Sequence, residues 1–134
     1  MNHYFLIDDD DIIQFIHRKV ISKADPEATV TAFYSVDEAL EHLARVVPSA
    51  LPQVIFLDIN MPMKSGFDFL DEITARPALH DALLRHTRIF LLTSSVNPRD
   101  LDQSKQYDLI EELLSKPLGN AVLDRLNIHL PLRT

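Results

Sequence analysis

The sequence contains no cysteine, and this absence excludes several kinds of chemistry at once. Such a chain has no disulfide bond, no thiolate nucleophile and no cysteine-ligated zinc site. The lack of disulfides also fits a reducing compartment, so we expect the protein to be cytoplasmic. Glycine is scarce too, with only two in the chain, and the sequence has no glycine-rich loop of the kind that holds nucleotide phosphates.

Patterns typical of membrane and nucleic-acid contacts are also missing. No apolar run approaches the roughly 20 residues of a membrane span, and the N-terminus does not resemble a secretory signal. The formal net charge is -7, and no block of lysine or arginine is available to neutralise phosphates. We therefore expect no membrane contact and no direct binding of nucleic acid.

The histidines do not suggest a metal site, because none of them has the paired spacing of metal ligands. We interpret all six as surface or core residues: His3, His17, His42, His80, His86 and His129.

The chain has the length of one domain. Its 134 residues, 46% of them apolar, are enough to bury one core without covalent staples. After Lys116 there is room for one helix and a short tail, so we expect a single domain over residues 1–134 with no output domain.

Strand and helix patterns alternate along the chain. Apolar runs predict strands that are buried in a sheet, and amphipathic patterns between them predict helices, one of which begins at Asn97-Pro98. Residues 76–87 are interpreted as a loop or an extra turn. Five such alternations predict a parallel sheet with helices on both faces. The predicted strands lie at 4–7, 28–33, 54–58, 89–92 and 109–114, and the helices follow at 12–23, 35–45, 67–76, 97 onward and 120–129.

Two helix starts carry cap signals. Asp11 is a plausible cap for the first helix, and Ser35 with Glu38 three residues later forms the pattern of a capping box.

Several predicted strands end in polar residues. The strand at 54–58 ends on Asp58, and the strand at 4–7 runs into four aspartates, of which Asp8 and Asp9 come first. The last two strands lead into Thr93 and Lys116. Because the carboxyl ends of parallel strands meet at one edge, these groups predict a rim that suits a hard cation and a phosphoryl group.

Each residue also has a simpler interpretation. Asp58 alone fits a helix cap or a solvated turn, and Thr93 fits a β-branched residue that ends a strand. Most lysines are solvated, so the same applies to Lys116. Asp10 and Asp11 fit the start of a helix, where the helix dipole favours negative charge, so we assign the preceding pair to the metal.

Taken together, Asp8-Asp9, Asp58, Thr93 and Lys116-Pro117 resemble the receiver domain of two-component response regulators, in its stand-alone, chemotaxis-regulator-like form. The resemblance covers nearly the whole chain. It implies a flavodoxin-like α/β fold in which a five-stranded parallel sheet, in strand order 2-1-3-4-5, is flanked by five helices on both faces.

The resemblance also implies the chemistry. Asp58 accepts a phosphoryl group from a histidine kinase or a histidine phosphotransfer protein. Mg²⁺ is held by Asp8, Asp9, Asp58 and the backbone carbonyl of Asn60, with Asp8 acting mainly through a bridging water. Thr93 and Lys116 bind the phosphoryl oxygens.

Other matching positions are implied to shape or tune the site. The bond between Lys116 and Pro117 is cis in the family. Gly66 matches a family glycine and allows a positive φ, although an ordinary turn glycine is the alternative. Ser94 and Ser95 make the hydroxyl assignment ambiguous by one position, and Ser95 with Asn60 lies where the family controls the access of water to the acyl phosphate.

The sequence departs from the family pattern near the fifth strand. Leu113 stands at the switch position, where receivers commonly carry an aromatic ring that turns inward on phosphorylation. Gln106-Tyr107-Asp108 replaces a frequent Gly-Ala motif, so the partner-facing surface is expected to differ.

Our leading hypothesis is a phosphorylatable switch that is not an enzyme on external substrates and that signals by altered binding of a downstream protein not yet identified. One alternative is a Mg²⁺-dependent phosphohydrolase with an aspartyl-phosphate intermediate, although the candidate nucleophile lies on the third predicted strand instead of within an Asp-x-Asp at the end of the first, and no cap insertion is visible. Another is a docking module of the same fold that is never phosphorylated, motivated by Leu113. A calcium loop is disfavoured because the acidic run lacks the spacing of an EF-hand. The last helix is a candidate surface for a homodimer.

Overall fold

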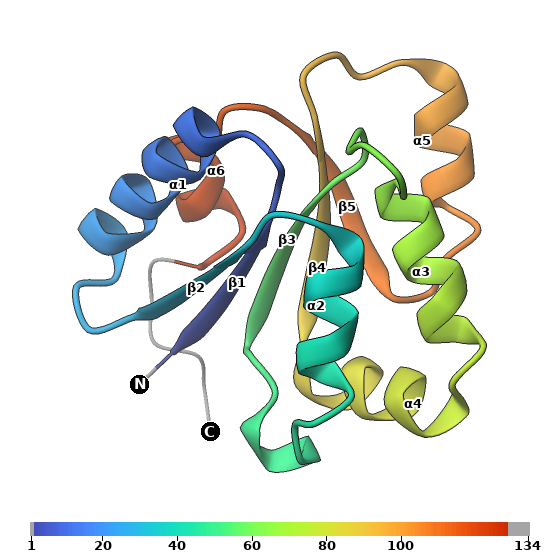
Figure 1. Cartoon of the computed structure of the whole chain (residues 1–134). Coiled ribbons are helices and arrows are strands. Elements are labelled where there is room, and N and C mark those ends of the chain that lie inside the picture. Colours follow the sequence, from blue (N-terminus) through green and yellow to red (C-terminus); the bar gives the residue numbers. More distant parts are fainter. Residues whose placement is uncertain (1, 129–134) are drawn as a thin grey trace.

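The computed structural model describes residues 2–128, which form one parallel sheet between two layers of helices (Figure 1). All neighbouring strands are parallel and lie in the order β2-β1-β3-β4-β5, which confirms the predicted topology. The strands are β1 (His3–Ile7), β2 (Thr29–Phe33), β3 (Val54–Asp58), β4 (Arg88–Thr93) and β5 (Ile110–Ser115).

The helices divide between the two faces of the sheet. Helices α1 and α6 cover one face, and α2, α3 and α5 lie on the other, with α4 at its lower end in Figure 1. Among residues 2–128, no helix is long and apolar enough to cross a membrane. The helices are α1 (Asp11–Ala24), α2 (Val36–Leu43), the short 3₁₀ helix η1 (Pro48–Ala50), α3 (Gly66–Thr74), α4 (Pro77–His86), α5 (Pro98–Ser104) and α6 (Asn120–Arg125).

Strand β3 lies in the middle of the sheet and is buried on both faces, which explains its apolar sequence. Phe56 packs with Ile21 of α1 and Leu123 of α6. Ile55 and Leu57 point the other way and pack in the cluster that includes residues of α2 and α3. Successive residues of a strand point to opposite faces, so a strand between two helical layers needs apolar residues at every position.

The expectation of five helices is wrong, because residues 77–86 form the additional helix α4. Pro77 ends the preceding segment but also occupies the first turn of α4, a position where its missing N–H costs nothing. Leu83 is fully buried, and Leu79 packs against the same core. These leucines are four residues apart, so the helical signal was present but short.

The cap signals are partly confirmed. Asp10, not Asp11, caps α1, and its carboxylate accepts hydrogen bonds from the first backbone amides of the helix. Ser35 caps α2 by accepting from the amide of Glu38, as predicted. The carboxylate of Glu38 accepts from the amide of Tyr34 and not from that of Ser35, so the reciprocal half of the capping box is displaced by one residue.

Helix α6 ends earlier than predicted. Its last helical residue is Arg125, and Asn127 takes a left-handed conformation with φ 59°. The amide of Ile128 then donates to the carbonyl of Leu123 at 2.9 Å, which closes the helix in the manner of a Schellman motif. His129, the predicted end of the helix, lies outside the described residues.

Candidate functional site

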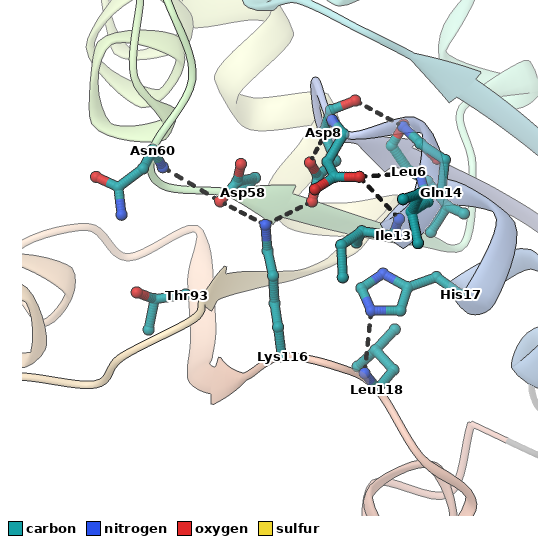
Figure 2. Close-up of polar contacts among 12 residues, drawn as sticks. Leu6, Asp8, Ile13, Gln14, His17, Asp58, Asn60, Thr93, Lys116 and Leu118 are labelled. Atoms are coloured by element: carbon teal, nitrogen blue, oxygen red, sulfur yellow. Dashed lines mark hydrogen bonds and ion pairs between the residues drawn. The ribbon is translucent and has the colours of Figure 1, made fainter.

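The register of the sheet brings the predicted site residues to one edge. Ile7 of β1 pairs with Leu57 of β3, so Asp8 and Asp58 leave the sheet at the same level. Thr93 of β4 pairs with Ser115 of β5, which places Lys116 one residue beyond that pair. Figure 2 shows the side chains of Asp8, Asp58 and Lys116 converging above this edge.

Lys116 contacts both buried carboxylates. Its Nζ lies 2.7 Å from Oδ2 of Asp8 and 3.0 Å from Oδ1 of Asp58. Each aspartate is only 2% exposed, and the lysine side chain is 11% exposed. Lys116 is therefore not the solvated surface lysine of the simpler interpretation. Its ammonium is the cation shared by two acids that would otherwise repel each other in a low dielectric.

The environment makes Asp58 a weaker acid than usual. Burial and the nearby Asp8 raise the pKa of Asp58 to about 6, although Lys116 and the amide of Asn60 act in the opposite direction. Burial lowers the pKa of Lys116, but Asp8 and Asp58 outweigh it, so the pKa of Lys116 is raised overall. The pocket thus holds a firmly charged ammonium beside a carboxylate whose ionised form is costly.

The acids are arranged as a cation site requires. Carboxylate oxygens of Asp8, Asp9 and Asp58 all lie within 4.8 Å of one another. Oδ2 of Asp8 is buried, and among residues 2–128 its polar partner is the ammonium of Lys116. Three carboxylates against one ammonium leave an excess of negative charge, and hard divalent cations prefer oxygen ligands of this kind. The residues present therefore fit a Mg²⁺ ion.

The acids border a pocket of about 360 Å³ at the sheet edge. The backbone of Asn60 also orients one acid, because its amide donates to Oδ1 of Asp58 at 3.2 Å. Asp8 is oriented similarly by the amide of Asp10 at 2.9 Å. The pocket is lined by Asp8, Asp9, Asp10, Ile13, Asp58, Asn60, Ser94, Lys116 and Pro117.

Thr93 lies beside this pocket but does not line it. Its Oγ1 donates to the carbonyl of Ser95 at 3.2 Å and accepts from the amide of Ser95 at 3.3 Å. Thr93 and Ser95 border a neighbouring polar hollow of about 550 Å³, which shares Asn60 and Ser94 with the acidic pocket. In this arrangement Ser94, and not Thr93, lines the acidic pocket.

Gly66 is needed for close packing and not for a positive φ, which corrects the sequence-based expectation. A Cβ atom built on Gly66 would lie 2.6 Å from the carbonyl oxygen of Asp58 and 3.2 Å from Cα of Ile59. The amide of Gly66 also donates to the carbonyl of Ile59 at 2.9 Å. The start of α3 is therefore pressed against the backbone that carries the candidate nucleophile.

The residue with positive φ in this loop is Met63, at 72°. The start of α3 is held by a complete capping box between Ser65 and Asp68. Lys64 adds ion pairs to Asp37 at 2.7 Å and Glu72 at 2.9 Å.

The loop after β5 has the form that the resemblance implies. The bond between Lys116 and Pro117 is cis. The amide of Lys116 donates to the carbonyl of Thr93 at 2.8 Å, which continues the pairing of β4 with β5 up to the lysine.

Leu113, at the switch position, is half-buried and packs against the core on the α3 side. An aromatic pair belongs to the same cluster, formed by Tyr107 stacked on Phe67 with ring centroids 5.9 Å apart. The hydroxyl of Tyr107 donates to Asp71 at 2.6 Å, and burial together with this bond raises the pKa of Tyr107 to about 12. An aromatic side chain is therefore present in this region, but on the α5–β5 connection instead of on β5.

Two polar residues of α1 were not predicted to take part in the site. Nε2 of Gln14 donates to the carbonyls of Leu6 and Asp8, each at 3.0 Å. Nε2 of His17 accepts from the amide of Leu118 at 3.0 Å. His17 was correctly interpreted as a core or surface residue, but its contact with the loop was not anticipated. Polar residues three apart on the inward face of an amphipathic helix were the available signal.

Comparison with known proteins agrees with the family resemblance found in the sequence. A family model described as response regulator receiver domain matches residues 4–126. No curated protein matches the sequence.

Among solved structures, a two-component response regulator from Cytophaga hutchinsonii is 28% identical, with a TM-score of 0.82 and coverage of 94% of this chain and 93% of that one. A response regulator receiver protein from Dyadobacter fermentans is also 28% identical, with a TM-score of 0.80 and coverage of 97% and 98%. The Mn²⁺-bound form of response regulator Rcp1 shares the fold at 22% identity, with a TM-score of 0.71 and coverage of 94% and 88%. The matched family model spans most of the chain, and this protein belongs to the family of response regulator receiver domains.

Proposed function

We propose that this receiver accepts a phosphoryl group on Asp58 from a phosphohistidine of a histidine kinase or phosphotransfer protein. The observation that carries the proposal is the placement of the Lys116 ammonium between Asp8 and Asp58 at the mouth of a pocket. A cation in that position neutralises the nucleophile while it is free, and it is within reach of phosphoryl oxygens once the carboxylate is bonded to phosphorus.

The proposed step is a simple transfer between two nucleophiles. A carboxylate oxygen of Asp58 attacks phosphorus, the O–P bond forms, and the N–P bond to the donor imidazole breaks. The leaving imidazole keeps the bonding electron pair and takes up a proton. The phosphoryl oxygens then lie beside Lys116 and the hydroxyl-bearing loop of Ser94 and Thr93.

Asp8, Asp9, Asp58 and the backbone carbonyl of Asn60 would hold Mg²⁺. The bound ion supplies positive charge that offsets repulsion between the carboxylates and the incoming phosphoryl group. The chemistry of the acidic cluster supports this assignment, and the similar Rcp1 structure is described as Mn²⁺-bound. In this proposal Asp9, the exposed member of the cluster, is a direct ligand, and buried Asp8 acts mainly through a bridging water.

The signal would leave the site through altered binding of a downstream protein. The hydroxyl of Thr93 is engaged within its own loop by Ser95, so a shift of Thr93 toward a phosphoryl oxygen must break that contact. The proposal further includes a cytoplasmic location and no catalysis beyond the protein's own phosphoryl transfer and dephosphorylation.

The docking-module alternative rests on Leu113, because an aliphatic side chain cannot act as the rotating aromatic ring of other receivers. It predicts that no phosphoryl group is ever added. The phosphohydrolase alternative predicts instead repeated turnover of small phosphate esters. Intact mass separates the docking module from the other two, and the release of phosphate from a small phosphate ester separates the phosphohydrolase.

The purified protein is incubated with acetyl phosphate and Mg²⁺, and its intact mass is measured. We expect one added phosphoryl group in the wild type, none in Asp58→Asn, and a large reduction when EDTA removes the metal. Asp102→Asn, at an exposed carboxylate of α5 outside the acidic pocket, is the matched control and should behave as the wild type. An unchanged wild-type mass, under conditions that modify a reference receiver, would contradict the proposal.

A further inference from the structure

His17 is an unusual residue to bury in the inner face of a helix. Its side chain is 1% exposed and extends from α1 toward the loop that follows β5 (Figure 2). Its Nε2 accepts a hydrogen bond from the amide of Leu118 at 3.0 Å, across 101 positions of sequence. Burying an imidazole costs free energy unless its polar atoms are paired. The hydrogen bond from Leu118 offsets part of that cost.

The Leu118 amide is the first backbone donor that follows Lys116, because Pro117 has no N–H. On the other side of the lysine, its own amide is held by the carbonyl of Thr93 at 2.8 Å. The loop is thus attached to β4 just before the Lys116 side chain and to α1 just after it. Between these two attachments the ammonium spans Asp8 and Asp58.

The same helix is anchored to the acidic side of the site. One turn before His17, Gln14 is 3% exposed and donates to the carbonyls of Leu6 and Asp8. Gln14 and His17 are three residues apart and so share one face of α1. This face therefore connects the end of β1, which carries Asp8, with the loop that carries Lys116.

The hydrogen bond requires a neutral imidazole whose Nε2 is free to accept. Burial and the nearby Lys116 lower the pKa of His17 while Asp8 acts in the opposite direction, and the resulting pKa is about 4. At neutral pH the ring is therefore uncharged, with its proton on Nδ1, because Nε2 is the acceptor.

We propose that His17 is a positioning residue for phosphoryl transfer, which holds the Leu118 amide and thereby fixes the Lys116 ammonium over Asp58. The role rests on the proposed function, since it concerns the rate of the same transfer. His17 touches none of the reacting atoms and acts through the loop. Misplacement of an active-site group by about 1 Å can cost up to about a hundredfold in rate, so a loosened loop has a measurable effect.

The test compares three substitutions by their rate of phosphorylation with acetyl phosphate and Mg²⁺. His17→Leu removes the acceptor, and we expect the rate to fall about tenfold or more. His17→Gln places an amide oxygen near the position of Nε2, and we expect it to restore most of the rate. Ile21→Val, on the same buried face of α1, is the control for a small packing defect and should keep the wild-type rate.

Hydrogen exchange of the Leu118 amide gives a readout that needs no phosphodonor. We expect slow exchange in the wild type and in His17→Gln, and fast exchange in His17→Leu. His17→Met offers the same loss with a closer volume should the leucine variant fail to fold. Equal Leu118 exchange in all folded variants would overturn the inference.

A double-mutant cycle separates positioning from general loss of structure. Because His17 is proposed to act through Lys116, His17→Leu should change the rate less than about twofold when Lys116→Ala is already present. If the two substitutions multiply instead, His17 has only a structural role and the inference is wrong.

The same data distinguish failure of this inference from failure of the proposed function. A wild type that accepts no phosphoryl group overturns both. A wild type that is phosphorylated at the same rate as folded His17→Leu overturns the positioning role and leaves the proposed function in place.

Discussion

Gly66 and Asp58 are in backbone contact: a Cβ atom on Gly66 would lie 2.6 Å from the carbonyl oxygen of Asp58. At this point the end of β3 and the start of α3 pack too closely to admit a side chain at position 66. Because the start of α3 packs directly against the backbone of the candidate nucleophile, we expect changes in α3 to shift the position of Asp58.

Gly66→Ala should destabilise the protein by about 1–3 kcal/mol, because the methyl group must push the backbone of Asp58 or Ile59 aside. Urea unfolding monitored by circular dichroism measures the change, and phosphorylation should slow as Asp58 shifts. Gly119→Ala is the matched control: nothing lies within 4 Å of a Cβ at that position, so its effect should stay within about 0.5 kcal/mol. Equal stability of the two variants would contradict the packing argument.

The carboxyl group of Asp58 should titrate near pH 6 in the metal-free protein, because burial and Asp8 raise its pKa to about 6. Carbon NMR of the labelled aspartate carboxyl measures this. Lys116→Ala should move the midpoint higher, since Lys116 lowers the pKa. Lys64→Ala should leave it unchanged, because that lysine pairs with Asp37 and Glu72. A midpoint close to 3.8, the ordinary pKa of an aspartate side chain, would show that the site is more solvated than the structure indicates.

Asp58→Asn should stabilise the metal-free protein at pH 7.5. The folded pKa of about 6 exceeds the value of 3.8 expected on unfolding, so the stability that Asp58 contributes is present below pH 3.8 and lost as pH rises through about 6. Removing the charge should return about 1–3 kcal/mol at pH 7.5 and almost nothing near pH 4. Thermal unfolding in EDTA at both pH values tests this, and a gain that is equal at both would refute the electrostatic explanation.

Phe15→Ala and Ile12→Ala should slow transfer from a protein donor but not from acetyl phosphate. Ile12 and Phe15 are 70% and 60% exposed, and they belong to α1, the helix whose Ile13 lines the acidic pocket. Burial of exposed apolar side chains of this size by a partner contributes strongly to the free energy of binding. Leu84→Ala on α4, at 44% exposure, is the control away from the site. Equal slowing with both donors would mean that the α1 side chains support the pocket and do not contact the donor.

Much of the fold could be predicted from the sequence, because the patterns that indicate strands and helices involve residues close together in the chain. The run at β3 is apolar at every position, which only a strand buried on both faces requires, and polar residues end each neighbouring strand. Parallel strands then force Asp58 and Lys116 to the same edge, so the site was predictable before any contact was known.

Other features depend on contacts between distant segments. Helix α4 has a weak pattern of its own, and it is held by burial of Leu83 against the core. The role of Gly66 is likewise set by the approach of β3 to α3, since its φ is not positive and so gives no sign of why glycine is required.

Periodicity and strand ends are properties of neighbouring residues, so they were enough to predict the parallel sheet and the acids, hydroxyls and lysine at one edge, while the strand order came from the family resemblance. Which of these groups touch depends on the packed structure. Lys116 spans Asp8 and Asp58, Thr93 stands aside, and His17 reaches Leu118, because distances between residues far apart in the chain are set by packing and not by sequence pattern.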